Sequence, residues 1–347
     1  MTNLKPIEII GGGLAGLTLG IALRRQAVPV RVVEAANYPR QRVCGEFING
    51  RGLGALDRLG LGDKLRAAGA VTARTARFFT PDAASPRRQL AEPALAISRY
   101  ALDDLLAQEF RERGGELCVG ERWRGTEWPE GTIRATGRRA NAATAGLQWY
   151  GLKIHARQIT LTADLEMHLL PSGYVGLCAL SGGEVNICGL FRRDPATGER
   201  PGNWRELLRG PAGSRLHERL REAIFLDDSF CSVAGLSLRP RRAEFDSECS
   251  VGDSVTMIPP VTGNGMSMAF ESAELATGPL LDYCQGHSDW ASARRAVATA
   301  CDRRFASRLA WARRLQWLIL QPRWQGLLLR CATNWPWLWS MFERKTR

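Results

Sequence analysis

The segment at 9–16, Ile-Ile-Gly-Gly-Gly-Leu-Ala-Gly, constrains the fold of this chain more than any other feature. It begins in an apolar run that predicts a buried strand, and the apolar spacing over 17–26 predicts a helix. Between them Gly11, Gly13 and Gly16 stand at G-x-G-x-x-G spacing. Such glycines permit a tight turn, let a pyrophosphate approach the backbone and let the helix pack closely on the strand. The N–H groups at the positive end of that helix then bind the anion.

A second predicted strand, at 28–33, ends in the acidic residue Glu34. A carboxylate at this position accepts hydrogen bonds from an adenosine ribose and repels a 2′-phosphate. Strand, glycine loop, helix, second strand and acid together predict a dinucleotide-binding βαβ unit. The alternative is a tight turn between strand and helix that binds no ligand.

Composition indicates in which compartment the protein works and whether it carries disulfides, zinc or a membrane span. The chain has 347 residues, which suffices for two or three structural parts, and its net charge is +12. Its nine cysteines include no C-x-x-C pair, which favours free thiols in a reducing cytoplasm over disulfides or zinc binding. No signal peptide is evident, and no uncharged apolar run reaches the roughly 18 residues of a spanning helix. We expect a cytoplasmic protein without a metal site.

The order of the predicted elements indicates an α/β fold that carries an insertion. Between residues 148 and 193, four strand-like runs are separated by short turns rich in Gly and Ser. This pattern predicts an antiparallel sheet inserted into the βαβ framework. The other predicted elements are helices at 52–68, 101–113, 203–208, 213–222 and 266–284, and strands at 71–79, 116–119, 231–238 and 250–257.

Four spaced stretches make the chain resemble the superfamily of FAD-dependent monooxygenases and geranylgeranyl-reductase-like flavoproteins. They are the glycine loop with Glu34, Arg99 in Ser-Arg-Tyr-Ala-Leu-Asp-Asp, Asp253 in Val-Gly-Asp, and Pro-Pro-Val-Thr-Gly-Asn-Gly-Met at 259–266. The resemblance implies a bound FAD, with Arg99 near its phosphates, Asp253 at its ribityl and diphosphate portion, and the 259–266 loop at the flavin ring. A helix N-terminus there favours negative charge on the reduced ring. The implied FAD contacts are Gly11, Gly13, Leu14, Ala15, Gly16, Glu34, Ala35, Arg42, Arg99, Val119, Asp253, Pro260, Gly263, Asn264, Gly265 and Met266.

The resemblance also implies a division of the chain into three parts. A discontinuous Rossmann-like FAD-binding domain takes 1–70, 98–147 and 240–288, and a substrate-binding domain with the antiparallel sheet takes 71–97 and 148–239. A helical region rich in Trp and Arg takes 289–347. Only one G-x-G-x-x-G unit follows a strand, so NADPH or NADH is expected to bind transiently as the electron donor.

The Cys44-Gly45-Glu46 loop is the candidate catalytic segment. The resemblance places it beside the flavin, and reductases of the geranylgeranyl type carry a Cys there. A thiol near the flavin positions substrate or donates a proton, and Glu46 acts as a general acid or base if burial raises its pKa. The alternative is a loop of small residues shaped to fit the ring, with Glu46 in solvent.

The inserted sheet carries the candidate substrate contacts. The hairpin residues Tyr174, Gly176 and Cys178 align with an aromatic motif of the geranylgeranyl reductases that this chain lacks, and His155 lies on a neighbouring predicted strand. Lys153 and Arg157 are predicted to face solvent.

Three functions remain open for this chain. The first expectation is NAD(P)H-dependent hydroxylation of a lipophilic, aromatic or polyketide-like substrate. Flavin-dependent reduction of a carbon–carbon double bond in a lipophilic substrate is the close alternative. A flavin-retaining protein that binds a membrane or a partner without turnover is the alternative from another class.

The C-terminal region concentrates positive charge and tryptophan. From Ala291 onward twelve Lys and Arg stand against two acidic residues, together with six of the eleven Trp. Cationic amphipathic helices with Trp suit an anionic membrane interface, so peripheral contact with the inner face of a membrane is one expectation. The alternative is a helical cap packed on the flavin domain. No nucleic-acid-binding module is recognisable, and we expect no nucleic acid partner.

Overall fold

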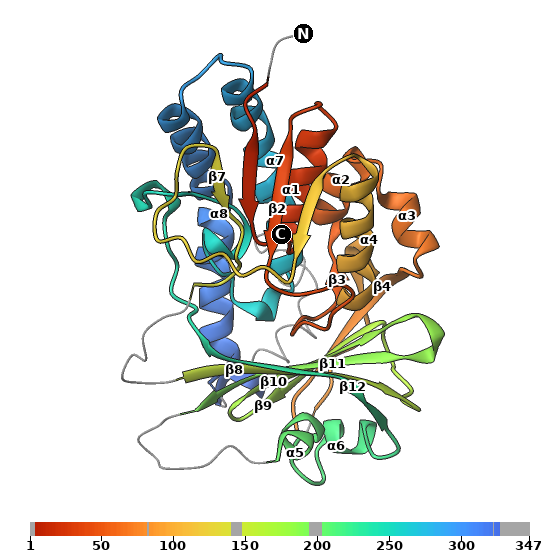
Figure 1. Cartoon of the computed structure of the whole chain (residues 1–347). Helices are drawn as coiled ribbons and strands as arrows, with labels where there is room; N and C mark the ends of the chain where they lie inside the picture. Colours follow the sequence, from red (N-terminus) through yellow and green to blue (C-terminus); the bar gives the residue numbers. More distant parts are fainter. Residues whose placement is uncertain (1–3, 82, 140–147, 194–202, 322, 327–347) are drawn as a thin grey trace.

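The computed structural model describes residues 4–81, 83–139, 148–193, 203–321 and 323–326. Two sheets organise this part of the chain. Sheet A is parallel and packed with helices, and the larger sheet B lies beside it (Figure 1). The predicted α/β fold with a second, largely antiparallel sheet is confirmed.

The predicted βαβ unit consists of β1 (Ile7–Ile10), α1 (Leu14–Arg24) and β2 (Val30–Glu34). β1 and β2 pair in parallel, as a crossover through a helix requires. α1 begins three residues earlier than predicted because the extended backbone of Gly13 forms its N-cap. Residues 14–23 are all buried, so α1 is a core helix rather than a surface helix with one apolar face.

Sheet A has the strand order β13–β7–β1–β2–β6, and all its neighbouring strands are parallel. Its other strands are the edge strands β6 (Glu116–Val119) and β13 (Cys249–Ser250) and the inner strand β7 (Thr132–Arg134). The strand predicted at 250–257 was therefore wrong beyond Ser250. Gly252 has a left-handed backbone with a φ of 64° and begins a short 3-10 helix, η4 (Gly252–Ser254), which ends the strand.

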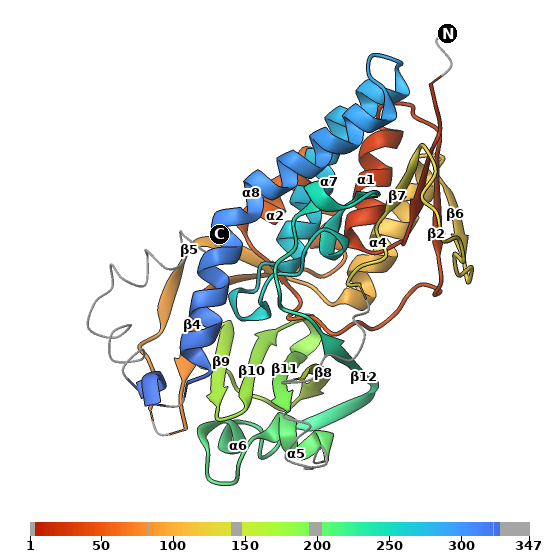
Figure 2. The same cartoon turned by 90° about the vertical axis from the view of Figure 1, so that its left-hand side faces the viewer.

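Helices pack in layers against sheet A. α1 contacts α4 and α7, while α2 and α8 contact α7 from outside (Figure 2). Among the described residues, none of the helices has the length and apolar character that a bilayer-spanning segment requires. The bounds are α2 (Gly50–Arg58), α3 (Gly62–Ala67), α4 (Arg99–Glu112), α7 (Gly265–Cys284) and α8 (Trp290–Ile319).

Sheet B has the order β12–β8–β11–β10–β9–β4–β5–β3, and its pairs are antiparallel except for the parallel pair β4–β9. Two short helices, α5 (Trp204–Arg209) and α6 (Arg215–Arg219), lie below it in Figure 1. α6 is shorter than the helix predicted at 213–222, and β12 begins seven residues before the predicted 231. The strands are β3 (Phe47–Ile48), β4 (Val71–Phe79), β5 (Arg88–Ala96), β8 (Gln148–Arg157), β9 (Leu165–Leu170), β10 (Gly173–Ala179), β11 (Val185–Arg193) and β12 (Ile224–Leu236).

Both faces of β8 are covered, which the alternation of its residues did not reveal. Leu152, Ile154 and Ala156 belong to the apolar core shared with α5 and α6. Lys153 lies on the opposite face and is fully buried, with its Nζ 2.5 Å from the Gln41 side-chain oxygen. The prediction that Lys153 faces solvent was wrong, because the loop that follows β2 covers this face. Arg157, at the end of the strand, is exposed as predicted.

α8 caps the helical layer and reaches sheet B with its C-terminal end (Figure 2). Arg308 on α8 and Glu271 on α7 form a buried ion pair with an N–O distance of 2.7 Å. Phe305, Leu309 and Ala312 are buried in the same core as sheet A. Residues 290–319 therefore cap the helical layer through Phe305, Leu309 and Ala312, but the expected packing of Trp residues fails at Trp317, which is 56% exposed. Of the Trp residues in this region, Trp335, Trp337 and Trp339 lie outside the described residues.

Candidate cofactor and substrate site

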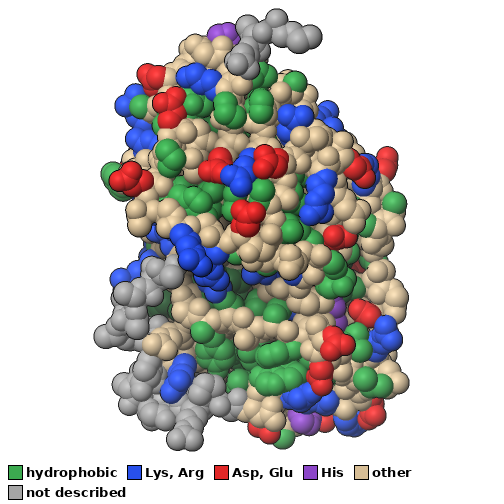
Figure 3. Space-filling model, viewed as in Figure 1, with side chains coloured by type: hydrophobic (Ala, Val, Ile, Leu, Met, Phe, Trp, Pro, Cys, Tyr) green, Lys and Arg blue, Asp and Glu red, His purple; other side chains and the backbone are tan. Residues whose placement is uncertain are grey.

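A cavity of about 990 Å³ lies between the two sheets. Its size is at the upper end of the range for small-molecule and cofactor pockets. Figure 3 shows a hollow in this face of the molecule, between the upper part built on sheet A and the lower part built on sheet B. Most of the predicted site residues line the cavity: Gly11, Gly13, Leu14, Ala15, Glu34, Ala35, Arg42, Cys44, Glu46, Arg99, Tyr174, Gly176, Cys178, Asp253, Pro260, Gly263, Gly265 and Met266. Gly16, Val119, His155 and Asn264 do not.

The glycine loop at the carboxyl end of β1 forms one end of the cavity. Gly11 has a φ of 112°, and a Cβ there would lie 2.3 Å from the carbonyl oxygen of Ala135, so only glycine fits. A Cβ on Gly13 would meet no atom within 4 Å, which leaves its backbone open to the cavity. Gly16 instead packs against the carbonyl of Gly11 and brings α1 close to β1. This is the cradle that a pyrophosphate requires.

Glu34, at the end of β2, is buried and fully engaged by neighbouring donors. The N–H groups of Gly12 and Ala36 donate to its carboxylate at 2.8 and 2.9 Å, and an Arg40 nitrogen lies 2.5 Å from Oε1. Burial acts to raise the pKa of Glu34, but Arg40 and the two N–H groups outweigh it and lower that pKa. The sequence did not predict the role of Arg40. The polar loop after β2 has two arginines, and nothing in its sequence indicates which of them pairs with Glu34.

Arg99 begins α4 and lines the cavity. The helix is capped by Ser98, whose hydroxyl accepts from the N–H of Ala101. Two nitrogens of the Arg99 guanidinium lie 2.6 and 2.9 Å from the carboxylate oxygens of Asp103, one turn later. This pairing holds the guanidinium at the cavity wall and raises the pKa of Arg99, so the positive charge is permanent. The arrangement suits the predicted phosphate contact.

Asp253 lies in η4 and projects from the sheet A side into the cavity. Asp253 is exposed to the open cavity, and the protein atoms that surround it there raise its pKa to about 6, although the positive charges of Arg99 and Arg138 act in the opposite direction. A carboxylate so placed has a strong need for hydrogen-bond donors, which the hydroxyl groups of a cofactor linker provide.

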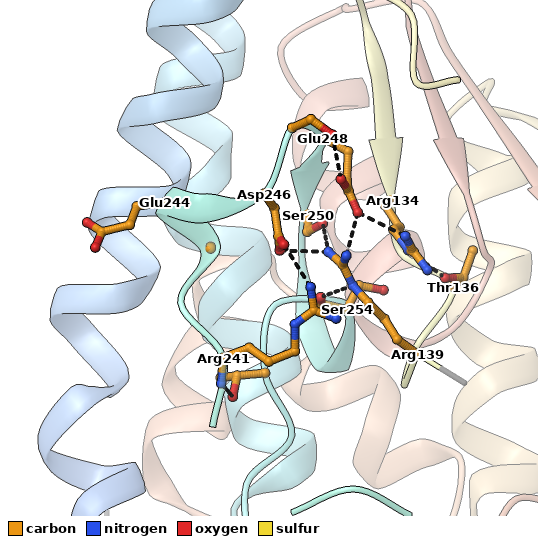
Figure 4. Close-up of polar contacts among 12 residues, drawn as sticks. Arg134, Thr136, Arg139, Arg241, Glu244, Asp246, Glu248, Ser250 and Ser254 are labelled. Atoms are coloured by element: carbon orange, nitrogen blue, oxygen red, sulfur yellow. Dashed lines mark hydrogen bonds and ion pairs between the residues drawn. The ribbon is translucent and has the colours of Figure 1, made fainter. Parts of the chain in front are cut away.

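A network of charged residues fixes the turn that carries Asp253 (Figure 4). Arg139 donates to the backbone oxygen of Ser254 at 3.1 Å and to Asp246 at 2.7 Å, and it pairs with Glu248 at 2.7 Å. Arg134, on β7, contacts the same Glu248 at 2.9 Å. The network ties the returning chain to the edge of sheet A, and sequence reasoning did not detect it because its members are more than 100 residues apart.

The 259–266 loop and the start of α7 form the adjoining wall. Gly263 has a φ of 62°, and α7 begins at Gly265, where a Cβ would meet no atom within 4 Å. The amide of Asn264 does not face the cavity. It hydrogen-bonds to Asn49, which in turn accepts from the hydroxyl of Ser267 at 2.7 Å. Asn264 therefore ties this loop to α2 instead of lining the site.

The Cys44-Gly45-Glu46 loop crosses the cavity wall on the sheet B side. Glu46 is fully buried, so the alternative in which it lies in solvent was wrong. Its carboxylate contacts His155 Nε2 at 2.6 Å and Lys153 Nζ at 3.1 Å. Asn186 donates to the backbone oxygen of Cys44 at 2.9 Å and fixes the loop to β11. Burial raises the pKa of the Cys44 thiol, which therefore stays protonated at neutral pH.

The sheet B wall consists mainly of apolar and thiol-bearing side chains, with the charged Arg77 and Glu166 among them. Gly176 and Cys188 are cross-strand partners on β10 and β11, and both line the cavity. A Cβ on Gly176 would lie 3.7 Å from its nearest neighbour, so this glycine leaves room for a bound molecule. Leu315 and Ile319 of α8 close the wall. His155, a predicted substrate contact, lies behind Glu46 and does not reach the cavity.

Comparison with known proteins agrees with this geometry. The model of an FAD-binding domain family matches residues 5–145. A menaquinone reductase of Mycolicibacterium smegmatis is 27% identical over 93% of this chain and 86% of that protein. Monooxygenase 1 of Arabidopsis thaliana is 45% identical over 17% of this chain and 15% of that protein. The structure of PqsL, a probable FAD-dependent monooxygenase from Pseudomonas aeruginosa, has a TM-score of 0.70 at 15% identity and covers 93% of this chain and 99% of that chain.

Residues 5–145 match an FAD-binding domain, and the chain is an FAD-dependent oxidoreductase. In this flavoprotein the matched family region contains the glycine loop, Glu34 and Arg99. The remaining candidate contacts, Asp253 and the 259–266 loop, come from the part of the chain beyond the matched region. The open backbone at Gly13 and Gly265 fits an extended dinucleotide that crosses the cavity between them.

Proposed function

We propose that this flavoprotein reduces a carbon–carbon double bond of a lipophilic substrate, with FAD bound non-covalently across the cavity. Gly13, Glu34 and Arg99 hold the adenosine and phosphate end, and Asp253 holds the polar linker. The 259–266 loop and the N-terminus of α7 would hold the flavin ring, and the helix dipole would favour its reduced, negatively charged form. The bound cofactor supplies the redox chemistry, and the protein supplies binding, orientation and a proton.

The observation that carries this proposal is the buried Glu46 beside an apolar wall. Reduction of a double bond adds a hydride and a proton, and the protein must provide the proton at a defined place. Glu46 lines the cavity and is held from behind by His155 and Lys153. The relatives that match over most of the chain support this reading, since they are reductases, whereas Monooxygenase 1 matches over 60 residues.

Hydroxylation is the second candidate. It is favoured by the fold shared with PqsL over nearly the whole chain. A hydroxylase needs the same flavin site and also benefits from a water-poor, apolar cavity. NADPH or NADH remains the proposed electron donor in either case, bound transiently, because β1–α1–β2 is the one strand–glycine-loop–helix unit that the sequence shows.

Product mass distinguishes the two reactions. The purified protein is incubated with NADPH or NADH and with a panel of quinone and isoprenoid substrates, in air and without oxygen. Reduction adds two hydrogens and proceeds without oxygen, whereas hydroxylation adds one oxygen atom and stops when oxygen is removed. Substrate-dependent oxidation of the nicotinamide with neither product would contradict both proposals.

The C-terminal helix supports a further proposal about substrate access. Trp317 is more than half exposed, while Leu315 and Ile319 on the same end of α8 line the cavity. Arg313 and Arg314 are exposed beside them. We propose that this end of α8 contacts an anionic membrane surface, so that a lipophilic substrate passes from the bilayer into the cavity.

A further inference from the structure

An imidazole lies between two carboxylates at the edge of the cavity. The Nε2 atom of His155 is 2.6 Å from Oε2 of Glu46, and its Nδ1 atom is 3.6 Å from Oε2 of Glu184. The side chain of Glu46 is 0% exposed, that of His155 is 5% exposed and that of Glu184 is 25% exposed. The three groups therefore form a line from the cavity wall to the protein surface.

The inner end of this line is held rigidly. Glu46 has a φ of 59°, a left-handed backbone that a residue with a side chain rarely adopts and that concentrates at functional sites. Its backbone oxygen accepts from the N–H of Ile97 at 3.0 Å. Oε1 is engaged by the N–H of Arg99 at 2.9 Å and by Lys153 at 3.1 Å, which leaves Oε2 for His155.

The outer end is held by one partner and reaches solvent. Arg157, whose side chain is 58% exposed, donates to Oε1 of Glu184 at 2.8 Å. The other oxygen of this carboxylate, Oε2, therefore faces the imidazole of His155. The backbone N–H of His155 donates to the hydroxyl of Ser229 at 2.7 Å, which fixes the strand at this point.

The remaining titratable groups near Glu46 do not compete for the proton. The guanidinium of Arg99 is paired with Asp103. Burial raises the pKa of the Cys44, Cys178 and Cys188 thiols and raises that of Cys231 to about 11, so all four stay protonated at neutral pH. Lys153 contacts Glu46 and Gln41 and is fully buried, so it has no route to solvent of its own.

We propose that Glu46, His155 and Glu184 form a proton relay from solvent to the cavity, an inference that rests on the proposed reductase function. When a hydride has been added to one carbon of the double bond, Glu46 gives its proton to the other carbon. The imidazolium of His155 returns a proton to Glu46, and solvent reprotonates His155 through Glu184. One proton enters from solvent for each proton added to the substrate. His155 and Glu184 are positioning residues that act through Glu46.

The first test uses the protein without substrate. The chain has four histidines, so a ¹³C-histidine NMR titration is tractable, and His155→Gln identifies the signal of His155. We expect Glu46→Gln and Glu184→Gln each to move the midpoint of the His155 titration to lower pH, because each removes a neighbouring negative charge. Glu274→Gln is the matched control. Glu274 is a surface carboxylate on α7, and its Oε2 accepts a hydrogen bond from an Arg58 nitrogen at 2.8 Å.

The second test follows product formation with a reducible substrate. We expect Glu46→Gln to slow the reaction by about 100-fold and Glu184→Gln by roughly tenfold, with a larger D₂O isotope effect and unchanged FAD affinity. Glu274→Gln should match wild type in rate and isotope effect.

The outcomes separate the relay from the reaction it serves. A His155 midpoint that does not move in Glu184→Gln, or a Glu184→Gln variant with the rate and isotope effect of Glu274→Gln, overturns the relay. If the midpoint moves as expected but the product contains oxygen, the coupled line of groups stands and the reductase proposal fails.

Discussion

The two walls of the cavity hold their polar groups in opposite ways. On the sheet A side, the ionised groups Glu34, Arg99 and Asp253 line the cavity, next to glycines whose backbone is open. On the sheet B side, thiols, Gly176 and apolar side chains form most of the cavity lining, with Arg77 and Glu166 among them, while the side chains of Lys153 and His155 lie behind the Cys44–Glu46 loop. The first wall suits a charged, extended cofactor, and the second suits a lipophilic substrate with one defined proton source.

We expect the largest loss of FAD affinity from substitutions at the glycines of the sheet A wall. Gly13→Ala should weaken FAD binding by tenfold or more, about 1.4 kcal/mol, since its Cβ would project into the path of the pyrophosphate. Gly11→Ala should lose FAD and also lower the melting temperature of the apoprotein, because its Cβ would lie 2.3 Å from a backbone oxygen. FAD titration and thermal melts of both apoproteins check this.

The two glycine variants control for each other. If Gly13→Ala lowered the melting temperature of the apoprotein as much as Gly11→Ala did, the open space beside Gly13 would not be the cofactor path.

Asp253 gives the next largest effect. Asp253→Ala should weaken FAD binding by on the order of 1–3 kcal/mol through loss of a hydrogen-bond acceptor, whereas Cys44→Ser should retain FAD and alter turnover. Titrating FAD into the two apoproteins compares them. Equal losses of affinity would make Cys44 a cofactor contact and remove the distinction between the walls.

The raised pKa of Asp253 predicts a pH dependence. Between about pH 3.8 and 6 the folded apoprotein keeps a proton on Asp253 that the unfolded chain releases. The free energy of unfolding therefore loses this contribution as pH rises through that window. Asp253→Asn, which cannot ionise, should be more stable than wild type above pH 6 and gain less at pH 4. Melting temperatures across pH without FAD measure this, and a pH-independent difference between the proteins would contradict it.

The sequence predicted the sheet A wall better than the sheet B wall, for a physical reason. Glycines, a strand-end acid and a helix start are local features, so the cofactor contacts follow from short stretches of chain. The burial of Lys153 and the engagement of Glu46 depend on a loop that covers β8 from a distance in sequence. The strand predicted at 250–257 failed because the left-handed backbone of Gly252 ends the strand and begins a 3-10 helix, while Val251 and Val255 are apolar because they pack in the core. The Arg139 network also arises only when distant segments meet, whereas the Arg40–Glu34 pair depends on how the loop after β2 folds back.

A substitution at Gly176 should have a smaller effect and tests whether the sheet B wall binds substrate. Gly176→Val should raise the KM for a lipophilic substrate and leave FAD affinity unchanged, because its side chain would occupy the space over β10. One buried methyl-sized group contributes about 1–3 kcal/mol to such discrimination, roughly 10–200-fold. Steady-state kinetics and FAD titration of the same preparation test it. A loss of FAD without a change in KM would mean that the sheet B wall binds the cofactor and not the substrate.

The smallest expected effect concerns α8 and the membrane. Wild-type protein should float with anionic liposomes at low salt and partly dissociate at high salt, since each Lys or Arg near the surface contributes about 1 kcal/mol that salt screens. Replacing Trp317 by Ala together with Arg313→Glu should reduce flotation without loss of FAD. Arg295→Glu, a charge change at the exposed N-terminal part of α8, is the control. If wild-type protein is absent from the floated fraction at low salt, α8 does not bind membranes and serves only to cap the helical layer.

The absorption spectrum of the purified protein decides whether the cavity binds FAD. We expect a yellow protein with a flavin spectrum, and heat denaturation should release intact FAD into the supernatant. The Gly13→Ala variant should be paler at equal protein concentration, while Gly176→Val should match wild type. A colourless wild-type protein that takes up no added FAD would contradict the assignment of the cavity.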